Sequence, residues 1–326
     1  MAAKTAIATW FVADSAADAT FFPQVAHRSD APAAQAIYWR CAAVFFASSR
    51  AQNPDARHLF YTNAPLPIVD GLDLAEWFER SGIEVVTLPI TYRLPRGSVG
   101  SWGNQFYIFD VLDHAAAAPP AEQLIVLDSD CLWRRPVAAM AVAIDQHGAL
   151  TYELGPAEHP AGEAINGLSR AGLARFVARH GGPPRASTPY CGGEIYAARA
   201  EVTARIAARA RALWPEVLAQ GEDAPREEAH LLSAIYAIEG LAIGTANPFI
   251  RRMWTTFRRN NLAASDEALT VWHLPAEKRT GLADLFARLA ADRPLGELAR
   301  AVGHPRRSPH KFVRDLSLKL REKLGF

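Results

Sequence analysis

Two aspartates that follow an apolar run, Asp128 and Asp130, are the residues whose types and spacing most clearly suggest chemistry. The run, 124–127, is apolar at every position, as expected of a strand covered on both faces. Residues two apart on an extended chain point to the same side, with Cα atoms about 6.6 Å apart. Two ionised carboxylates this close repel each other unless a proton or a cation lies between them. The pair therefore predicts a site for a hard divalent ion more than acid–base work.

A bare Asp-x-Asp can also cap a turn after a strand, because aspartate is common there. The buried run before the pair and the apolar Leu132 and Trp133 after it favour the functional interpretation. In open α/β sheets ligands gather beyond the carboxyl ends of the strands, where this pair would lie.

The elements that must position the pair alternate along the chain. We expect strands at 5–13, 57–62, 83–90 and 123–127, separated by helices at 33–53, 72–81 and 104–117. This order predicts an α/β fold with a mostly parallel, Rossmann-like sheet flanked by helices. Further helices are expected at 137–147, 168–180, 202–219 and 226–238, and further strands at 149–153, 190–198 and 269–273. No convincing linker divides this body, so we expect one domain over 1–285 and a helical tail over 286–326.

Composition and charge exclude several classes of protein. The 326 residues carry a formal net charge of +1, which offers no broad field for nucleic acid. Three widely spaced cysteines without a Cys-x-x-Cys argue against a disulfide framework and a structural zinc site. No run of 18 apolar residues occurs, and we expect a cytoplasmic protein.

The segment around Asp128 resembles a known family, the GT-A fold glycosyltransferases, especially the group of glycogenin and the bacterial lipopolysaccharide galactosyltransferases. In that family a hydrophobic strand leads into Asp-x-Asp and an apolar pair, as 127–132 does here. The resemblance implies a GT-A fold and a Mn²⁺ or Mg²⁺ cofactor. It also implies that Asp130 ligates the metal directly and that Asp128 contacts the metal or the ribose of a nucleotide sugar.

Two segments after Asp130 and one residue near the N-terminus extend the resemblance. In 190–195 it implies that Gly192 and Gly193 let the donor sugar approach the backbone, although Cys191 stands where the family has Asn. In 271–278 it implies that His273 completes the metal shell and that Lys278 holds the diphosphate. The spacing from His273 to Lys278 is one residue shorter than in the family, and taken alone His273 could be a satisfied histidine at a strand end. Asp14, after the first strand, is implied to contact the nucleotide.

Three glutamates are candidates for the catalytic carboxylate that takes the proton of an acceptor hydroxyl. Glu194 lies inside an otherwise apolar strand, where a carboxylate must be paired or functional. Glu227 and Glu228 resemble an acidic pair at the start of a late helix in the family. Glutamate in a first helical turn is also favoured by the helix dipole, so a structural role stays open for them.

These residues together predict a metal-dependent hexosyltransferase. Its donor would be a nucleoside-diphosphate sugar, with a UDP-sugar expected, and its acceptor a hydroxyl of a cell-envelope glycan or glycolipid. One alternative is a haloacid dehalogenase-like phosphatase with Asp128 as nucleophile, although its motif usually lies near the N-terminus. The other is a non-catalytic, membrane-peripheral binding protein on the same fold.

The C-terminal segment 306–326 has seven basic and two acidic residues. Phe312, Leu316, Leu320 and Leu324 recur every four residues, which predicts a basic amphipathic helix. It could pack against the body with its cations in solvent. Alternatively it could lie on an anionic membrane surface, at the inner face of the membrane, and bring the enzyme to a lipid-linked acceptor.

Overall fold

A seven-stranded sheet forms the centre of the computed structural model, which describes residues 3–98, 101–155, 163–185, 187–298, 302–303 and 308–324. The strand order is β14-β10-β13-β8-β1-β4-β7. The neighbours of β1 and β4 run parallel, whereas β13 lies antiparallel between β8 and β10. The strands are β1 (Thr5–Phe11), β4 (Arg57–Thr62), β7 (Ile83–Thr87), β8 (Gln123–Leu127), β10 (Ala149–Glu153), β13 (Cys191–Arg199) and β14 (Gly244–Thr245). This mostly parallel sheet confirms the predicted fold class.

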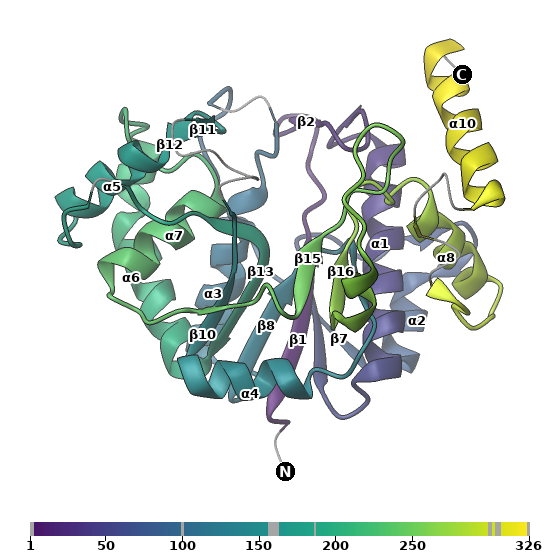
Figure 1. The fold of residues 1–326 in the computed structure, drawn as a ribbon, viewed down its shortest axis with the longest axis horizontal. Helices are drawn as coiled ribbons and strands as arrows, with labels where there is room; N and C mark the ends of the chain where they lie inside the picture. Colours follow the sequence, from purple (N-terminus) through teal and green to yellow (C-terminus); the bar gives the residue numbers. More distant parts are fainter. Residues whose placement is uncertain are drawn as a thin grey trace.

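Helices cover both faces of the sheet (Figure 1). On one face α1 packs against α8, and on the other α3 packs on α6 and α6 on α7. The helices are α1 (Pro32–Gln52), α2 (Leu74–Arg80), α3 (Ile108–Ala117), α4 (Ala138–His147), α5 (Arg170–Arg179), α6 (Ala200–Leu218), α7 (Glu228–Ile238), α8 (Gly281–Ala290) and α10 (Pro309–Leu324). The layers explain why β8 is apolar from Leu124 to Leu127, because all five residues of the strand are buried.

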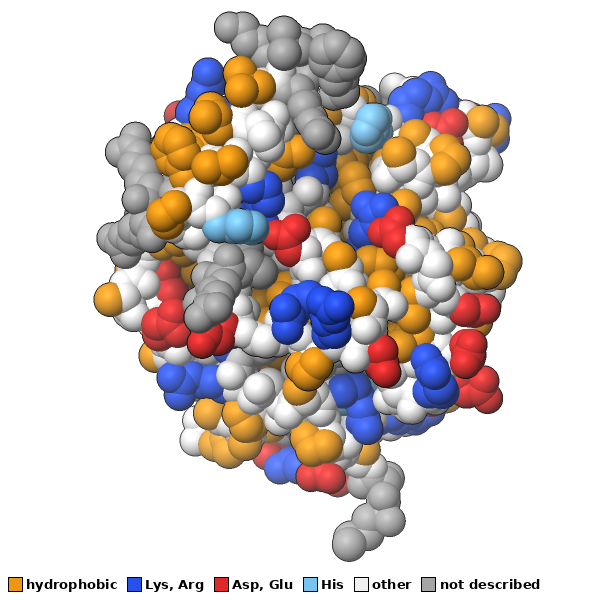
Figure 2. Space-filling model, turned by 90° about the vertical axis from the view of Figure 1, so that its right-hand side faces the viewer, with side chains coloured by type: hydrophobic (Ala, Val, Ile, Leu, Met, Phe, Trp, Pro, Cys, Tyr) orange, Lys and Arg blue, Asp and Glu red, His pale blue; other side chains and the backbone are white. Residues whose placement is uncertain are grey.

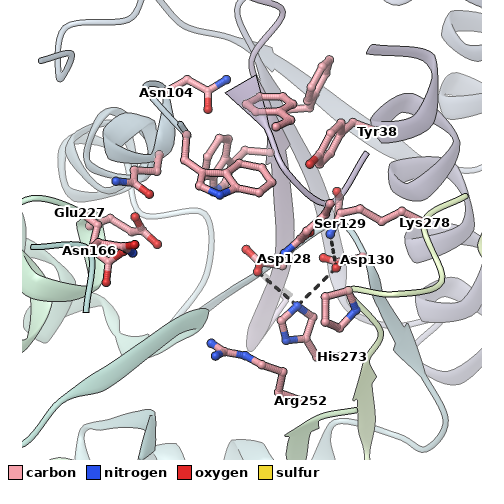
Figure 3. A pocket seen from close by; sticks show the side chains of 18 of the residues that line it. Tyr38, Asn104, Asp128, Ser129, Asp130, Asn166, Glu227, Arg252, His273 and Lys278 are labelled. Atoms are coloured by element: carbon pink, nitrogen blue, oxygen red, sulfur yellow. Dashed lines mark hydrogen bonds and ion pairs between the residues drawn. The ribbon is translucent and has the colours of Figure 1, made fainter. Parts of the chain in front are cut away.

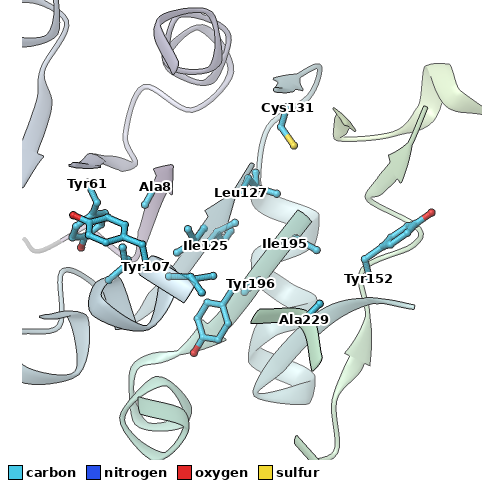
Figure 4. Packing of buried hydrophobic residues seen from close by; sticks show 14 of the residues in the cluster. Ala8, Tyr61, Tyr107, Ile125, Leu127, Cys131, Tyr152, Ile195, Tyr196 and Ala229 are labelled. Atoms are coloured by element: carbon cyan, nitrogen blue, oxygen red, sulfur yellow. The ribbon is translucent and has the colours of Figure 1, made fainter. Parts of the chain in front are cut away.

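The core around β8 is shown in Figure 4, where Ile125 and Leu127 lie beside Ile195 and Tyr196 of β13. These pairs follow the antiparallel register, in which Ile195 is opposite Leu127. Two predicted strands are shorter than expected: 5–13 ends at Phe11 and 83–90 ends at Thr87. Beyond β1 the chain leaves the ladder, and the amide of Ala13 donates to the side chain of Asn63 instead (2.8 Å).

A second sheet of three short strands was not predicted as such. It consists of β15 (Ile250–Arg252), β16 (Val271–His273) and β9 (Cys131–Trp133), in that order. The predicted strand 269–273 thus joins this sheet and not the central one. Its register places His273 opposite Cys131, and the amide of Leu274 donates to the carbonyl of Asp130 (3.0 Å). The small sheet therefore brings segments 140 residues apart to one place beside the end of β8.

The C-terminal helix is present as α10, as predicted (Figure 1). The expected boundary at 285 falls within α8, and the division into domain and tail stays a prediction. Residues 306 and 307 of the predicted basic segment, and the side chains from 321 onward, lie outside the described part of the structure. None of the described helices has the length and apolar character needed to cross a membrane.

Candidate metal and nucleotide-sugar site

A cavity of about 370 Å³ opens beside the end of β8. Figure 3 shows that its two sides carry different groups. We call one side the ion wall, formed by Asp128, Asp130, His273 and Lys278. The other is the acid wall, formed by Asn166, Glu227 and Glu228.

The ion wall brings together the three predicted metal ligands. One ligand atom each from Asp128, Asp130 and His273 lies within 4.8 Å of the others. The Nε2 atom of His273 is 3.4 Å from an oxygen of Asp128 and 3.4 Å from an oxygen of Asp130. The convergence follows from the small sheet, which fixes His273 beside the turn after β8. Two carboxylates and an imidazole with a common focus fit a divalent ion such as Mn²⁺ or Mg²⁺.

Charges within the ion wall compensate one another. The Lys278 ammonium forms an ion pair with Asp130, and both side chains are buried. Burial opposes ionisation of Asp130, but Lys278 and His273 outweigh it and lower the pKa of Asp130. Burial likewise opposes the charge of His273, yet Asp130 and Glu194 raise its pKa to about 9. Asp128 lies at the edge of this group, and desolvation raises its pKa.

Glu194 lies behind His273 and is fully buried. It accepts two hydrogen bonds from the Arg252 guanidinium, at 3.0 and 2.7 Å. Its other neighbour is Nδ1 of His273, 3.6 Å away. Burial opposes its ionisation, but Arg252 and His273 hold the pKa of Glu194 down, at about 2. The predicted catalytic candidate Glu194 is therefore an ionised carboxylate beside the predicted metal ligand His273, and it is paired with Arg252, which also lines the cavity.

Among the described residues, no lysine or arginine forms an ion pair with Glu227 or Glu228 on the acid wall. Glu227 accepts hydrogen bonds from the Tyr190 hydroxyl and the Asn166 amide, and Nε2 of His230 lies 3.5 Å from it. One oxygen of Glu228 is buried and has no hydrogen-bond partner among the described residues. Burial, reinforced by Glu227, raises the pKa of Glu228 well above its ordinary value.

The two predicted glycines lie against these carboxylates. A Cβ atom at Gly192 would overlap the carboxylate of Glu194, and one at Gly193 would overlap that of Glu228. Each glycine thus leaves room for one glutamate side chain. This explains the need for glycine at both positions in a different way from the predicted approach of a donor sugar. Their contact with a donor stays a prediction.

Asp14 is buried at the end of the first strand segment. It accepts a hydrogen bond from Arg93 (2.8 Å) and one from Asn104 (3.3 Å). Burial raises its pKa. Asn104 also lines the cavity, so Asp14 supports a cavity residue and is itself held by Arg93.

Asn104 and Asn166 line the cavity but were not predicted from the sequence. For Asn166 a signal exists, since Asn166-Gly167 is a turn dipeptide, and the structure gives both residues positive φ angles of 44° and 86°. Asn104 begins the predicted helix 104–117 and has no comparable sequence signal.

Comparison with known proteins gives structural matches alone: no protein-family model and no curated protein sequence matches the chain. A crystal structure of the galactosyltransferase LgtC with donor and acceptor sugar analogs is 12% identical, covers 88% of this chain and 96% of its own, and has a TM-score of 0.50. A second crystal structure, of an LgtC active-site mutant, is 13% identical, covers 82% of this chain and 86% of its own, and has a TM-score of 0.46. This chain has the GT-A fold. The GT-A resemblance seen in the sequence is thereby confirmed for the fold, and an Asp-x-Asp site lies in the cavity that the fold provides.

Proposed function

We propose that this GT-A chain is a metal-dependent glycosyltransferase that transfers a hexose from a nucleoside-diphosphate sugar, a UDP-sugar, to a hydroxyl acceptor. The observation that carries the proposal is the convergence of Asp128, Asp130 and His273 in one cavity. The structural neighbour that was crystallised with donor and acceptor sugar analogs supports it, because the likeness extends over most of both chains.

The ion wall would hold Mn²⁺ or Mg²⁺ through these three side chains. A bound divalent ion supplies positive charge for the departing diphosphate. Lys278 is the cation of the chain itself that could share this task, since its ammonium lines the cavity. It also lies 5.5 Å from the ring centre of Tyr38, another residue that lines the cavity.

The acid wall supplies the groups that would face the reacting sugars. Glu228 is our main candidate for this role, because its buried oxygen has no partner among the described residues and is free to bind a hydroxyl. Because its pKa is raised, Glu228 holds a proton more readily than an exposed glutamate and could donate a hydrogen bond. We assign Glu227 to a supporting role, since Tyr190 and Asn166 fix it, and Glu194 to orienting His273.

The donor class is tested by a thermal-shift screen of UDP-, GDP-, CMP- and dTDP-sugars, each with and without Mn²⁺. We expect UDP-sugars to raise the melting temperature, and to do so only when Mn²⁺ is present. One of these UDP-sugars should also release UDP on incubation. Release of phosphate from generic phosphomonoesters would favour the phosphatase alternative. If the protein neither bound nor turned over any donor, the alternative of a non-catalytic protein on this fold would be favoured.

A membrane-linked acceptor is the finer part of the proposal. Phe312, Val313, Leu316 and Leu320 of α10 are exposed, at 42%, 66%, 43% and 51% of their surface. Figure 2, which views the molecule from the side that carries α10, shows hydrophobic side chains interspersed with lysine and arginine. Apolar and basic side chains together bind the interface of an anionic bilayer. We therefore place the enzyme at the inner face of the membrane, acting on a cell-envelope glycan or glycolipid.

This part is tested by sedimentation with anionic vesicles. The triple variant Val313→Ser, Leu316→Ser, Leu320→Ser should lose most of its co-sedimentation, while Val142→Ser, at an exposed apolar residue of α4, should not. Equal sedimentation of all three proteins would remove the membrane from the proposal and leave the transferase site untouched.

A further inference from the structure

Glu277 is a fully buried carboxylate next to Lys278 in the chain. One of its oxygens accepts hydrogen bonds from the amide of Gly281 (3.0 Å) and the hydroxyl of Thr280 (2.5 Å). Its backbone carbonyl accepts from the amides of Thr280 and Leu282, each at 3.0 Å. Glu277 therefore shapes the turn that carries Lys278 and starts α8.

The charge of Glu277 is balanced from the C-terminal helix. Lys311 of α10 places its ammonium 2.7 Å from the other carboxylate oxygen, Oε1, and Arg314 lies 3.7 Å from the oxygen that accepts from Gly281, Oε2. Both of these cations belong to α10. The Lys311 side chain is 2% exposed, so this is an ion pair shielded from water. Burial makes such a pair costly to break from one side, because the remaining charge stays desolvated.

These charges also explain how α10 is seated. An amphipathic helix ordinarily turns its apolar side to the body. Here Lys311, Arg314 and Asp315 face the body, whereas Val313 and Leu316 are exposed. The seat of α10 combines these charges with apolar contacts, since the ring of Phe312 meets that of Phe257 at 5.1 Å and Leu318 lines a pocket with Ala276. The ion pairs are thus specific contacts of this helix and not an incidental surface pair.

The geometry points to Lys311 as a positioning residue for Lys278. By neutralising Glu277, Lys311 keeps the 277–281 turn in the conformation that directs Lys278 to Asp130 in the cavity. The C-terminal helix would then complete the diphosphate side of the pocket from outside it. The role of Lys278 in this inference rests on the proposed function.

The test compares Lys311→Met with Lys319→Met, a matched loss of charge on α10 at a lysine whose ammonium lies 4.8 Å from the ring centre of Phe257. Binding of UDP with Mn²⁺ is measured by calorimetry, and hydrogen exchange is measured at the amides of Gly281 and Leu282. We expect Lys311→Met to weaken UDP binding on the order of tenfold, as an indirect coupling between two sites does, and to speed hydrogen exchange at both amides. Lys319→Met should change neither.

Two further variants separate positioning from general destabilisation. In a Lys278→Met background, Lys311→Met should cause no additional loss of UDP affinity. The double variant Glu277→Gln, Lys311→Met, which removes the buried charge with its partner, should recover most of the affinity and the slow exchange. The inference would be overturned if Lys311→Met lowered UDP affinity by the same factor in the Lys278→Met background as in the wild type. It would also be overturned if Lys311→Met kept the wild-type UDP affinity and exchange rates. If the wild-type protein bound no UDP, the proposed function would fail, while the exchange data would still test the link between α10 and the turn.

Discussion

On the ion wall of the cavity, Asp130 has a histidine and a lysine as neighbours (Figure 3), whereas on the acid wall Glu228 has no ion-pair partner and one oxygen without a hydrogen-bond partner among the described residues. The pKa of Asp130 is accordingly lowered and that of Glu228 is raised. Both carboxylates lie in the same cavity, so neighbouring charge and not burial alone separates them. The difference teaches that the ion wall pairs its carboxylates with cations, so that a metal ion could replace the Lys278 ammonium at Asp130. On the acid wall, burial favours the protonated form of Glu228.

The largest expected effect is the fall in the rate of sugar transfer when the ion wall loses one of its carboxylates. Asp128→Asn removes a carboxylate whose side chain is 42% exposed, so the fold should be kept. We expect transfer from a UDP-sugar to fall more than about a hundredfold, because one of the three proposed metal ligands is lost. The matched control is Asp70→Asn, whose side chain is 52% exposed in a surface pair with Arg40. Equal activity of Asp128→Asn and the control would remove the ion wall from the mechanism.

The two glycines allow each wall to be disturbed separately. Gly192→Ala pushes on Glu194, behind His273, and should weaken Mn²⁺ by about tenfold or more, as the loss of a partner of a ligand does. Gly193→Ala pushes on Glu228 and should reduce turnover while leaving Mn²⁺ affinity within about twofold. Manganese titration by electron paramagnetic resonance, together with steady-state rates, distinguishes them. The same loss of Mn²⁺ affinity in both variants would contradict the separation of the walls.

The smallest expected effect concerns stability and pH. Because the pKa of Glu228 is raised above the ordinary 4.5, the folded state favours its protonated form. Its contribution to stability is therefore complete below about pH 4.5 and is lost as the pH rises toward the folded pKa. Glu228→Gln removes this loss, and we expect a gain in unfolding free energy of roughly 1 kcal/mol at pH 8.

Denaturant unfolding of Glu228→Gln at pH 5 and pH 8 checks this sign. The gain should be larger at pH 8 than at pH 5. A variant that is less stable than the wild type at pH 8 would show that Glu228 is held as a carboxylate by partners we have not assigned. Glu239→Gln is a useful contrast, since its pKa is lowered by neighbouring arginines and the variant should lose stability.

Local sequence was sufficient to predict six of the seven strands of the central sheet, although β1 and β7 end earlier than predicted and the two-residue strand β14 was not predicted. The apolar run before Asp128 identified β8, and the alternation of strands and helices predicted the fold class. Of the small sheet, β16 was predicted as the strand 269–273, but β9 and β15 were not, because strands of three residues carry too short a pattern to be recognised reliably. The proximity of His273 to Asp130 came from the family resemblance and not from spacing.

The pairing of buried charges was also not predictable from the sequence. Glu194 was conspicuous as a carboxylate in an apolar strand, but its partner Arg252 lies 58 residues further on and resembles any surface arginine. Lys311 likewise read as one of several basic residues in a solvated helix. Such pairs are fixed by tertiary packing, so a single sequence shows the charge and not its neighbour.

The central claim, that the ion wall binds a nucleoside diphosphate through a divalent cation, is tested most directly by calorimetric titration of the wild-type protein with UDP. One titration contains Mn²⁺ and the other contains EDTA. We predict measurable binding with Mn²⁺ and a loss of at least about a hundredfold with EDTA. Equal affinity in the two titrations would contradict the claim.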